Sequence, residues 1–397
     1  MPIARAVKDA FAESSLIRRL FEEGSELKKI HGAENVFDFS IGNPDLDPPP
    51  AFHRVLNDLA AEDAKGSHGY MNNAGFPEVR AALAEKASRE QECDVPGENI
   101  ILSVGAAGAL NVIFKSILNP GDEVIVPAPY FMEYRSYAAN HGGKIVEVPT
   151  REDFGLDCEK IENALGPKTR AVLINSPHNP TGRVYPEADL ARLGSVLNRR
   201  GKRTGVYPFL VADEPYREIV YNGVKVPSVF NAYGESIAAT SFSKSLSLPG
   251  ERIGYITVNP RISDAGDVLA ALIYATRVLG FVNAPALMQR VVARLTGERV
   301  AVDIYAARRE AFKKVLDGAS IQYAEPEGAF YLFARVPASG DDRAFSDCLK
   351  KRLILGVPGS AFRAPGWIRF AYCVDEKVIA ASAGAFKAAA EEWRAAR

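Results

Sequence analysis

Apolar residues follow two patterns along most of the chain, short continuous runs and longer stretches with helical spacing. Short runs rich in β-branched residues predict buried strands, whereas apolar positions that recur every three or four residues predict helices. Between about residue 78 and residue 290 the patterns alternate, with strands expected at 99–104, 122–129, 143–149, 169–175, 208–214 and 236–242 and helices at 77–90, 106–118 and 186–200. Alternating strands and helices predict an α/β fold whose mostly parallel sheet is covered on both faces.

The two ends of the chain differ from this middle part. Residues 1–31 have helical apolar spacing, at Val7, Phe11, Leu16 and Leu20, and a loop rich in turn formers follows at 41–50. After residue 290, a helical segment precedes strand candidates and a final helix, at 297–318, 329–336, 354–359, 367–374 and 375–397. This order predicts a second, smaller α+β domain. We therefore expect an N-terminal arm with part of the small domain (1–50), a large domain (51–290) and a small C-terminal domain (291–397).

Composition and charge exclude several classes of protein. With 47% hydrophobic and 24% charged residues and a net charge of −1, the chain resembles a globular protein without a basic surface for nucleic acid or acidic membranes. The four cysteines and five histidines are dispersed, so we expect no metal site and a reducing compartment. Because the sequence has neither a signal peptide nor an apolar run of about 18 residues, we expect a cytoplasmic protein.

Polar and small residues follow several of the predicted strands. In an open α/β sheet the carboxyl ends of the strands form the ligand crevice, so these residues are candidates for a site. Gly105, Ala106 and Ala107 follow the first strand, where small residues let a phosphate approach the N–H groups of a helix start. No Walker A lysine follows, which excludes a P-loop. The alternative is a tight turn that packs a helix against the sheet.

Two further strand ends carry an amide, a carboxylate and a phenol. Asn179 lies in the rigid loop NSPHNPTG, where it is either a hydrogen-bonding ligand or a turn asparagine. Asp213 and Tyr216 lie in VADEPYRE, directly after an apolar strand. A carboxylate there needs a cation or a proton donor if it is buried, and the alternative is a helix N-cap.

The stretch SFSKSLSLPGER contains a lysine among groups that suit a phosphate. Ser241, Ser243 and Arg252 offer short hydroxyl donors and a planar guanidinium. Lys244 is then either another phosphate ligand or an amine that forms a Schiff base with a carbonyl, and a solvated loop is the alternative. Taken together, a phosphate cradle, a carboxylate, an asparagine, a tyrosine and a lysine match what pyridoxal phosphate requires.

In their order and residues these motifs resemble the class I/II pyridoxal-phosphate aminotransferases of fold type I, over nearly the whole chain. The resemblance implies a mostly parallel seven-stranded sheet in the large domain and a homodimer with shared active sites. It implies Lys244 as the Schiff-base lysine and catalytic proton carrier. The remaining cofactor ligands it implies are Ser241, Ser243 and Arg252 at the phosphate, Asp213 at the pyridine nitrogen, and Asn179 and Tyr216 at the phenolic oxygen, with Gly105, Ala106 and Ala107 beside the phosphate.

Other segments extend the resemblance to the substrate. APYF implies that Phe131 stacks on the cofactor ring, and GYMNNAGF implies that Tyr70 crosses the dimer interface to the partner's phosphate. IGNPDLDPP implies that the backbone of Gly42 contacts the substrate carboxylate, which Asn179 also lines. WIRFAY implies that Arg369 binds the α-carboxylate.

Arg277 lies near the position from which aspartate-specific relatives contribute an arginine across the dimer interface. It predicts a preference for aspartate or glutamate, or a broad range, unless the side chain faces solvent or pairs with an acidic residue.

The resemblance implies transfer of an amino group between an L-amino acid and a 2-oxo acid. Other pyridoxal-phosphate reactions, such as β-elimination, C–S cleavage or decarboxylation, use nearly the same cofactor residues and remain alternatives, as does an aromatic or alanine-type aminotransferase. A transcription regulator built on this fold would need a DNA-binding module, for which we expect no room before residue 31.

Overall fold

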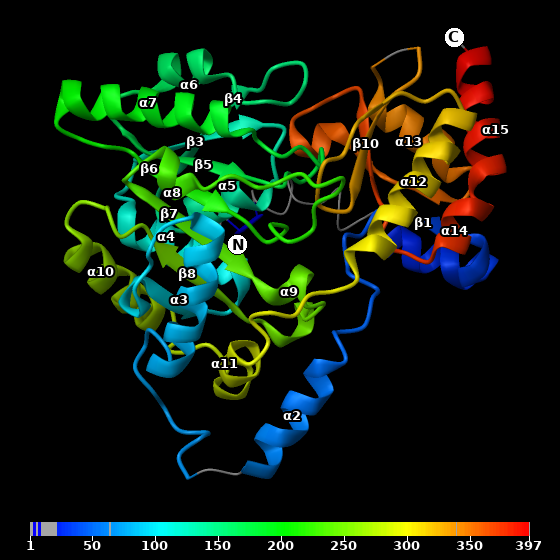
Figure 1. The fold of residues 1–397 in the computed structure, drawn as a ribbon. Coiled ribbons are helices and arrows are strands. Elements are labelled where there is room, and N and C mark those ends of the chain that lie inside the picture. Colours follow the sequence, from blue (N-terminus) through cyan, green and yellow to red (C-terminus); the bar gives the residue numbers. More distant parts are fainter. Residues whose placement is uncertain (1–2, 5–6, 9–21, 63–64, 339, 397) are drawn as a thin grey trace.

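The structure is a computed structural model that describes residues 3–4, 7–8, 22–62, 65–338 and 340–396 (Figure 1). Residues 22–31 are helical, within the helical segment predicted for 1–31. Three of the four apolar positions behind that prediction, Phe11, Leu16 and Leu20, lie outside the described residues. None of the described helices is both long enough and apolar enough to cross a membrane.

A seven-stranded sheet forms the centre of the larger part of the molecule. Its strands, in spatial order, are β2 (Ile100–Ser103), β8 (Gly254–Val258), β7 (Ser236–Ser241), β6 (Phe209–Asp213), β5 (Thr169–Asn175), β3 (Glu123–Ala128) and β4 (Lys144–Pro149). Only β8 runs antiparallel to its neighbours, so the expected mostly parallel α/β sheet is confirmed. All six predicted strands are present, and β8 is the addition.

Helices cover both faces of this sheet because its strands are apolar on both sides. Ala171 and Leu173 of β5 belong to one buried cluster, whereas Val172 and Ile174 belong to the other. The first cluster packs against α4 (Gly105–Ile117), α5 (Glu133–Ala139) and α10 (Ala265–Val278). The second packs against α2 (Ala51–Glu62), α3 (Pro77–Gln91), α6 (Cys158–Ala164), α7 (Glu187–Thr204), α8 (Val229–Ala232), α9 (Phe242–Ser245) and α11 (Ala286–Ala293).

The C-terminal elements form a separate layer with its own apolar core, on the right in Figure 1. Its antiparallel sheet has the order β12 (Val357–Pro358), β13 (Trp367–Ala371), β10 (Tyr331–Arg335) and β9 (Tyr323–Ala324). Its helices are α12 (Val302–Gly318), α13 (Asp342–Lys350), α14 (Glu376–Ala381) and α15 (Ala383–Ala395). The N-terminal strand β1 (Phe37–Asp38) joins this layer by pairing with β11 (Ile354–Leu355). The division of the chain at residues 50 and 290 stays a prediction.

Two helix predictions for this part need correction. The helix expected from residue 297 begins only at Val302. The single helix expected at the C-terminus is two helices that meet at Ser382, whose hydroxyl donates to the Ile379 carbonyl oxygen at 2.7 Å. Such a side-chain bond to a carbonyl competes with the regular helix ladder and often bends or interrupts it.

The sheet order places several of the predicted site residues side by side. β5, β6 and β7 are neighbours, and the register aligns Asn175 with Asp213 and Asp213 with Ala239. Their carboxyl ends therefore lie at one edge, which the segments carrying Asn179, Tyr216 and Lys244 immediately follow.

Candidate active site

A cavity of about 710 Å³ lies at this edge, between the seven-stranded sheet and the C-terminal layer. The residues predicted from sequence that line it are Gly42, Ala106, Ala107, Phe131, Asn179, Asp213, Tyr216, Ser241, Ser243, Lys244, Arg252 and Arg369. These residues come from segments more than 300 positions apart in the chain. The structure therefore brings together most of the predicted site in a single cavity.

Lys244 projects from the short helix α9 into this cavity. Its Nζ atom donates a hydrogen bond to the Gly42 carbonyl oxygen at 2.8 Å and lies 5.4 Å from the centre of the Phe330 ring. Burial, together with the positive charges of Arg369 and Arg252, lowers the pKa of Lys244 to about 8. An amine with such a pKa can act as a proton acceptor near neutral pH.

Asp213 ends strand β6 and is almost fully buried. Its Oδ2 atom accepts a 2.5 Å hydrogen bond from the Tyr134 hydroxyl, whereas Oδ1 has no hydrogen-bond partner among the described residues. Burial raises the pKa of Asp213 to about 7, although the hydrogen bond from Tyr134 acts in the opposite direction. A buried acceptor without a partner is costly, so Oδ1 is suited to a donor supplied by a ligand.

Asn179 and Arg369 contact each other across the cavity. The Asn175 side chain donates to the Asp213 carbonyl oxygen at 2.8 Å and accepts the Asn179 backbone N–H at 2.7 Å, which fixes the start of the loop. Arg369 in β13 donates from Nη1 to the Asn179 side-chain oxygen at 3.0 Å and from Nη2 to the Ser40 carbonyl at 2.7 Å. Its buried Nε atom has no partner in the part of the chain that the structure describes.

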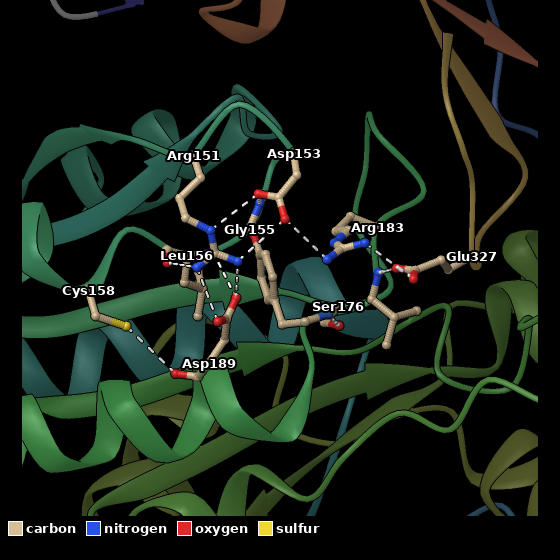
Figure 2. A network of polar contacts seen from close by, with 11 residues as sticks. Arg151, Asp153, Gly155, Leu156, Cys158, Ser176, Arg183, Asp189 and Glu327 are labelled. Carbon is tan, nitrogen blue, oxygen red and sulfur yellow. Dashed lines mark hydrogen bonds and ion pairs between the residues drawn. The ribbon is translucent and has the colours of Figure 1, made fainter.

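A polar network outside the cavity supports the loop that carries Asn179 (Figure 2). Arg183 pairs with Glu327 at 3.2 Å and with Asp153 at 3.4 Å, while the Val184 N–H donates to the same Glu327 carboxylate at 2.9 Å. Glu327 lies four residues before Tyr331, at the start of β10. The network therefore connects this loop of the large sheet to the C-terminal layer.

The expected phosphate corner is formed where α4 begins. Gly105 has φ +82°, and a Cβ atom there would lie 2.8 Å from an Arg252 guanidinium nitrogen. Arg252 donates to the Pro249 carbonyl at 2.9 Å and to the Val104 carbonyl at 3.3 Å. The helix N-terminus, this arginine and two buried serines, Ser241 and Ser243, thus provide donors suited to an anion.

These groups fit pyridoxal phosphate. The cofactor has an anionic phosphate for the Arg252 corner and a pyridine nitrogen whose proton would satisfy Oδ1 of Asp213. Its aldehyde reacts with an amine, and Lys244 supplies a buried one in the same cavity.

Three predicted residues do not line the cavity of their own chain: Gly105, at the start of α4, and Tyr70 and Arg277. Tyr70 is 94% exposed, and Arg277 lies on the exposed side of α10 with its guanidinium 5.5 Å from the Tyr274 ring centre. Both were expected to act across a dimer interface, so their roles stay predictions.

The lining residues that were not predicted from the sequence include Tyr134, Asn175 and Tyr331. Asn175 opens the NSPHNPTG motif and lies at a strand end, so its position gave a usable signal. Tyr134 follows Phe131 by one helical turn, whereas Tyr331 lies in an apolar strand where an aromatic residue indicates only core packing.

Comparison with known proteins identifies the family. Residues 34–386 match the family model for aminotransferase class I and II, and the chain belongs to this family. A probable aspartate/prephenate aminotransferase of Aquifex aeolicus is 32% identical over 377 residues, which cover 90% of this chain and 92% of that protein. The chain is a transaminase, and its family uses pyridoxal phosphate.

Solved structures agree with this assignment. An amino transferase from Eubacterium rectale has a TM-score of 0.95 and 37% identity and covers 99% of both chains. The aspartate aminotransferase of Thermus thermophilus, solved with maleate, has a TM-score of 0.84 and 28% identity and covers 94% of this chain and 96% of that one. The aspartate aminotransferase-like α/β fold is thereby established for this protein.

Proposed function

We propose that this transaminase binds pyridoxal phosphate in the 710 Å³ cavity and moves the amino group of an acidic L-amino acid to a 2-oxo acid. The observation that carries the proposal is the unpartnered, buried Oδ1 of Asp213 in the same cavity as Lys244. An amino acid alone could offer its ammonium group to this carboxylate, but it has no aldehyde for Lys244 and no phosphate for the Arg252 corner of the same cavity.

The cofactor would be held by groups from both ends of the cavity. Ser241, Ser243, Arg252 and the α4 N-terminus with Gly105, Ala106 and Ala107 would bind the phosphate. Asp213 would pair with the ring nitrogen, Asn179 and Tyr216 would bind the phenolic oxygen, and Phe131 would pack on the ring. When bound, the cofactor supplies an electron-accepting ring that makes the Cα–H bond of a bound amino acid acidic.

Lys244 and Arg369 would carry the steps at the substrate. With a pKa of about 8, roughly a tenth of Lys244 is unprotonated at pH 7. Nζ can therefore accept the proton from Cα of the amino acid in one half of the reaction and donate a proton to Cα of the new amino acid in the other half. Arg369 would hold the α-carboxylate by its planar guanidinium, and Gly42 would contact the same group through its backbone. Fixing the carboxylate orients the Cα–H bond toward Nζ.

We also propose a cytoplasmic homodimer in which Tyr70 and Arg277 of one protomer reach the cavity of its partner. Support comes from their position, because both lie outside the cavity of their own chain and Tyr70 is 94% exposed. Arg277 would then bind the distal carboxylate of aspartate or glutamate. Two similar proteins carry the name aspartate or aspartate/prephenate aminotransferase, which agrees with an acidic substrate.

The test measures 2-oxo acid formed from aspartate and from alanine, with and without an added 2-oxo acid acceptor. A transaminase with this specificity turns over repeatedly only with the acceptor, forms at most one equivalent of 2-oxo acid per site without it, and prefers aspartate. Arg277→Ala should lower the aspartate-to-alanine ratio of kcat/KM about 10- to 100-fold, the value of a charge-assisted contact. The control is Arg203→Ala on the exposed face of α7. An unchanged ratio in Arg277→Ala, or more than one equivalent of product per site without acceptor, would contradict the proposal.

A further inference from the structure

Tyr331, the first residue of β10, contacts two residues of the proposed site at once. It is buried, lines the cavity, and has its hydroxyl oxygen 2.8 Å from the Tyr216 hydroxyl oxygen. The centre of its ring lies 4.6 Å from the Arg369 guanidinium carbon. One side chain of the C-terminal layer therefore touches both the proposed ring-oxygen donor and the proposed carboxylate ligand.

The hydrogen bond between the Tyr216 and Tyr331 hydroxyls can have either residue as its donor, because each phenol has one proton. In the proposed function the Tyr216 hydroxyl donates its hydrogen bond to the cofactor's ring oxygen, so that the Tyr216 oxygen can only accept one from Tyr331. Tyr331 must then donate to Tyr216.

We propose that Tyr331 is a positioning residue that directs the Tyr216 proton toward the cofactor and holds the plane of Arg369. The proposal rests on the proposed function, since it concerns how that same site is arranged. It makes a chain of donors, from Tyr331 to Tyr216 to the ring oxygen. Consecutive hydrogen bonds polarise one another, so the first donor strengthens the second.

The surroundings leave the Tyr331 hydroxyl little freedom. A Cβ atom at Gly42 would lie 2.1 Å from this oxygen, so the backbone of Gly42 passes directly against it. The Tyr216 ring in turn packs edge to face against Phe330, with 5.4 Å between the ring centres. A hydroxyl confined between Gly42 and Tyr216 keeps Tyr216 as its partner.

The ring of Tyr331 acts on Arg369 through its face. The guanidinium carbon lies 4.6 Å from the centre of the Tyr331 ring and 4.8 Å from that of the Phe362 ring. Its Nη atoms bond to Asn179 and Ser40, and Nε has no partner among the described residues. Two aromatic rings at these distances restrict the orientation of the guanidinium plane, so that its edge stays available for a carboxylate.

Two variants separate the two roles. Tyr331→Phe removes only the hydroxyl, whereas Tyr331→Leu removes the hydroxyl and the ring. Tyr305→Phe is the matched control, because Tyr305 is fully buried, packs on Phe330 and has a hydroxyl without a partner in the described chain. The readouts are the pH midpoint of the visible absorption of the cofactor-loaded protein and the Kd for maleate, a dicarboxylate that lacks an amino group.

We expect Tyr331→Phe to raise the pH midpoint by about one unit, because a weaker Tyr216 donor stabilises negative charge on the ring oxygen less well. Its Kd for maleate should stay within about twofold. Tyr331→Leu should show the same midpoint change and bind maleate about tenfold more weakly, the value of a buried cation–π contact. Tyr305→Phe should match the unmodified protein in both measurements.

The opposite proton direction gives the opposite sign. If Tyr216 donated to Tyr331, removing the acceptor would release the Tyr216 proton to the cofactor and lower the midpoint. A lowered or unchanged midpoint in Tyr331→Phe, with normal absorption in the unmodified protein, would overturn this inference alone. An unmodified protein that retains no cofactor absorption would overturn the proposed function and this inference with it.

Discussion

The Tyr134 hydroxyl donates a 2.5 Å hydrogen bond to Oδ2 of Asp213 and thereby leaves Oδ1 as the oxygen available to a ligand. Tyr134 belongs to helix α5 and Asp213 to strand β6, so the contact joins a helix to the end of a sheet strand beside the cavity. The same bond opposes the effect of burial, which by itself raises the pKa of Asp213. Tyr134 therefore supports both the orientation and the charge of the carboxylate.

Removing the Tyr134 hydroxyl should weaken cofactor binding and disfavour ionisation of Asp213, while the carboxylate itself stays in place. In Tyr134→Phe the pKa of Asp213 should rise further, and because the proposed reaction needs the ionised carboxylate, the acidic limb of kcat/KM should move to higher pH. Pyridoxal phosphate should bind about tenfold more weakly, the value of one hydrogen bond to a charged group. Tyr130→Phe is the control, since Tyr130 is also buried but bonds to Glu147. Equal pH profiles for both variants would refute this role.

The raised pKa of Asp213 predicts how the cofactor-free protein responds to pH. The carboxyl has a pKa of about 7 in the fold and 3.8 as its ordinary value, so the native state binds the extra proton between these limits. Stability is therefore lost as the pH rises from about 4 to about 7, and is flat above. In Asp213→Asn this decrease in stability between about pH 4 and about pH 7 should be absent.

Urea unfolding of the cofactor-free proteins at about pH 5 and about pH 8 measures the difference. Relative to the unmodified protein, Asp213→Asn should gain about 2–3 kcal/mol of unfolding free energy between the two pH values. Glu214, whose pKa burial also raises to about 7, is present in both proteins and cancels in the comparison. If the difference in unfolding free energy between Asp213→Asn and the unmodified protein were the same at both pH values, the raised pKa of Asp213 would be contradicted.

Arg369→Lys should impair substrate binding more than cofactor binding. Lysine keeps the charge but loses the planar fork that bonds to Asn179 and Ser40 and offers a second edge to a carboxylate. KM for the amino acid should rise about 10- to 100-fold while the visible spectrum of the bound cofactor stays the same. Arg335→Lys, at the exposed end of β10, serves as the control. An unchanged KM in Arg369→Lys would remove this residue from the carboxylate site.

The Arg183–Glu327 pair in Figure 2 should couple the Asn179 loop to the C-terminal layer. Both side chains are about three-quarters shielded, at 26% and 29% exposed. A double-mutant cycle with Arg183→Ala and Glu327→Ala should give a coupling of about 1 kcal/mol in unfolding free energy.

The exposed pair Arg199–Glu162 provides the comparison for that cycle. Its side chains are 58% and 42% exposed, and its coupling should be close to zero. Similar coupling in the two pairs would mean that the network around Arg183 contributes no more than a surface ion pair.

The sequence predicted the central sheet well for a physical reason. Strands of a sheet covered on both faces are continuous apolar runs, and β5, with Ala171 and Leu173 on one face and Val172 and Ile174 on the other, is an example. The position of β8 between β2 and β7 could not be predicted, because pairing order depends on long-range contacts that periodicity does not encode.

For the site, the sequence identified groups with distinctive chemistry at strand ends, such as Lys244 and Asp213. It did not identify Tyr134 or Tyr331, whose importance comes from partners 79 and 115 residues away. An aromatic residue in an apolar segment looks like core packing until the fold shows which polar atom its hydroxyl meets.

Whether Lys244 binds pyridoxal phosphate in this cavity can be measured by a visible-absorption scan. The protein is loaded with the cofactor and unbound material is removed by desalting, in parallel with Lys244→Ala and with the exposed control Lys225→Ala. We predict a visible band that stays with the unmodified protein and with Lys225→Ala, and its loss in Lys244→Ala. A band that persists unchanged in Lys244→Ala, or no band in the unmodified protein, would contradict cofactor binding by Lys244.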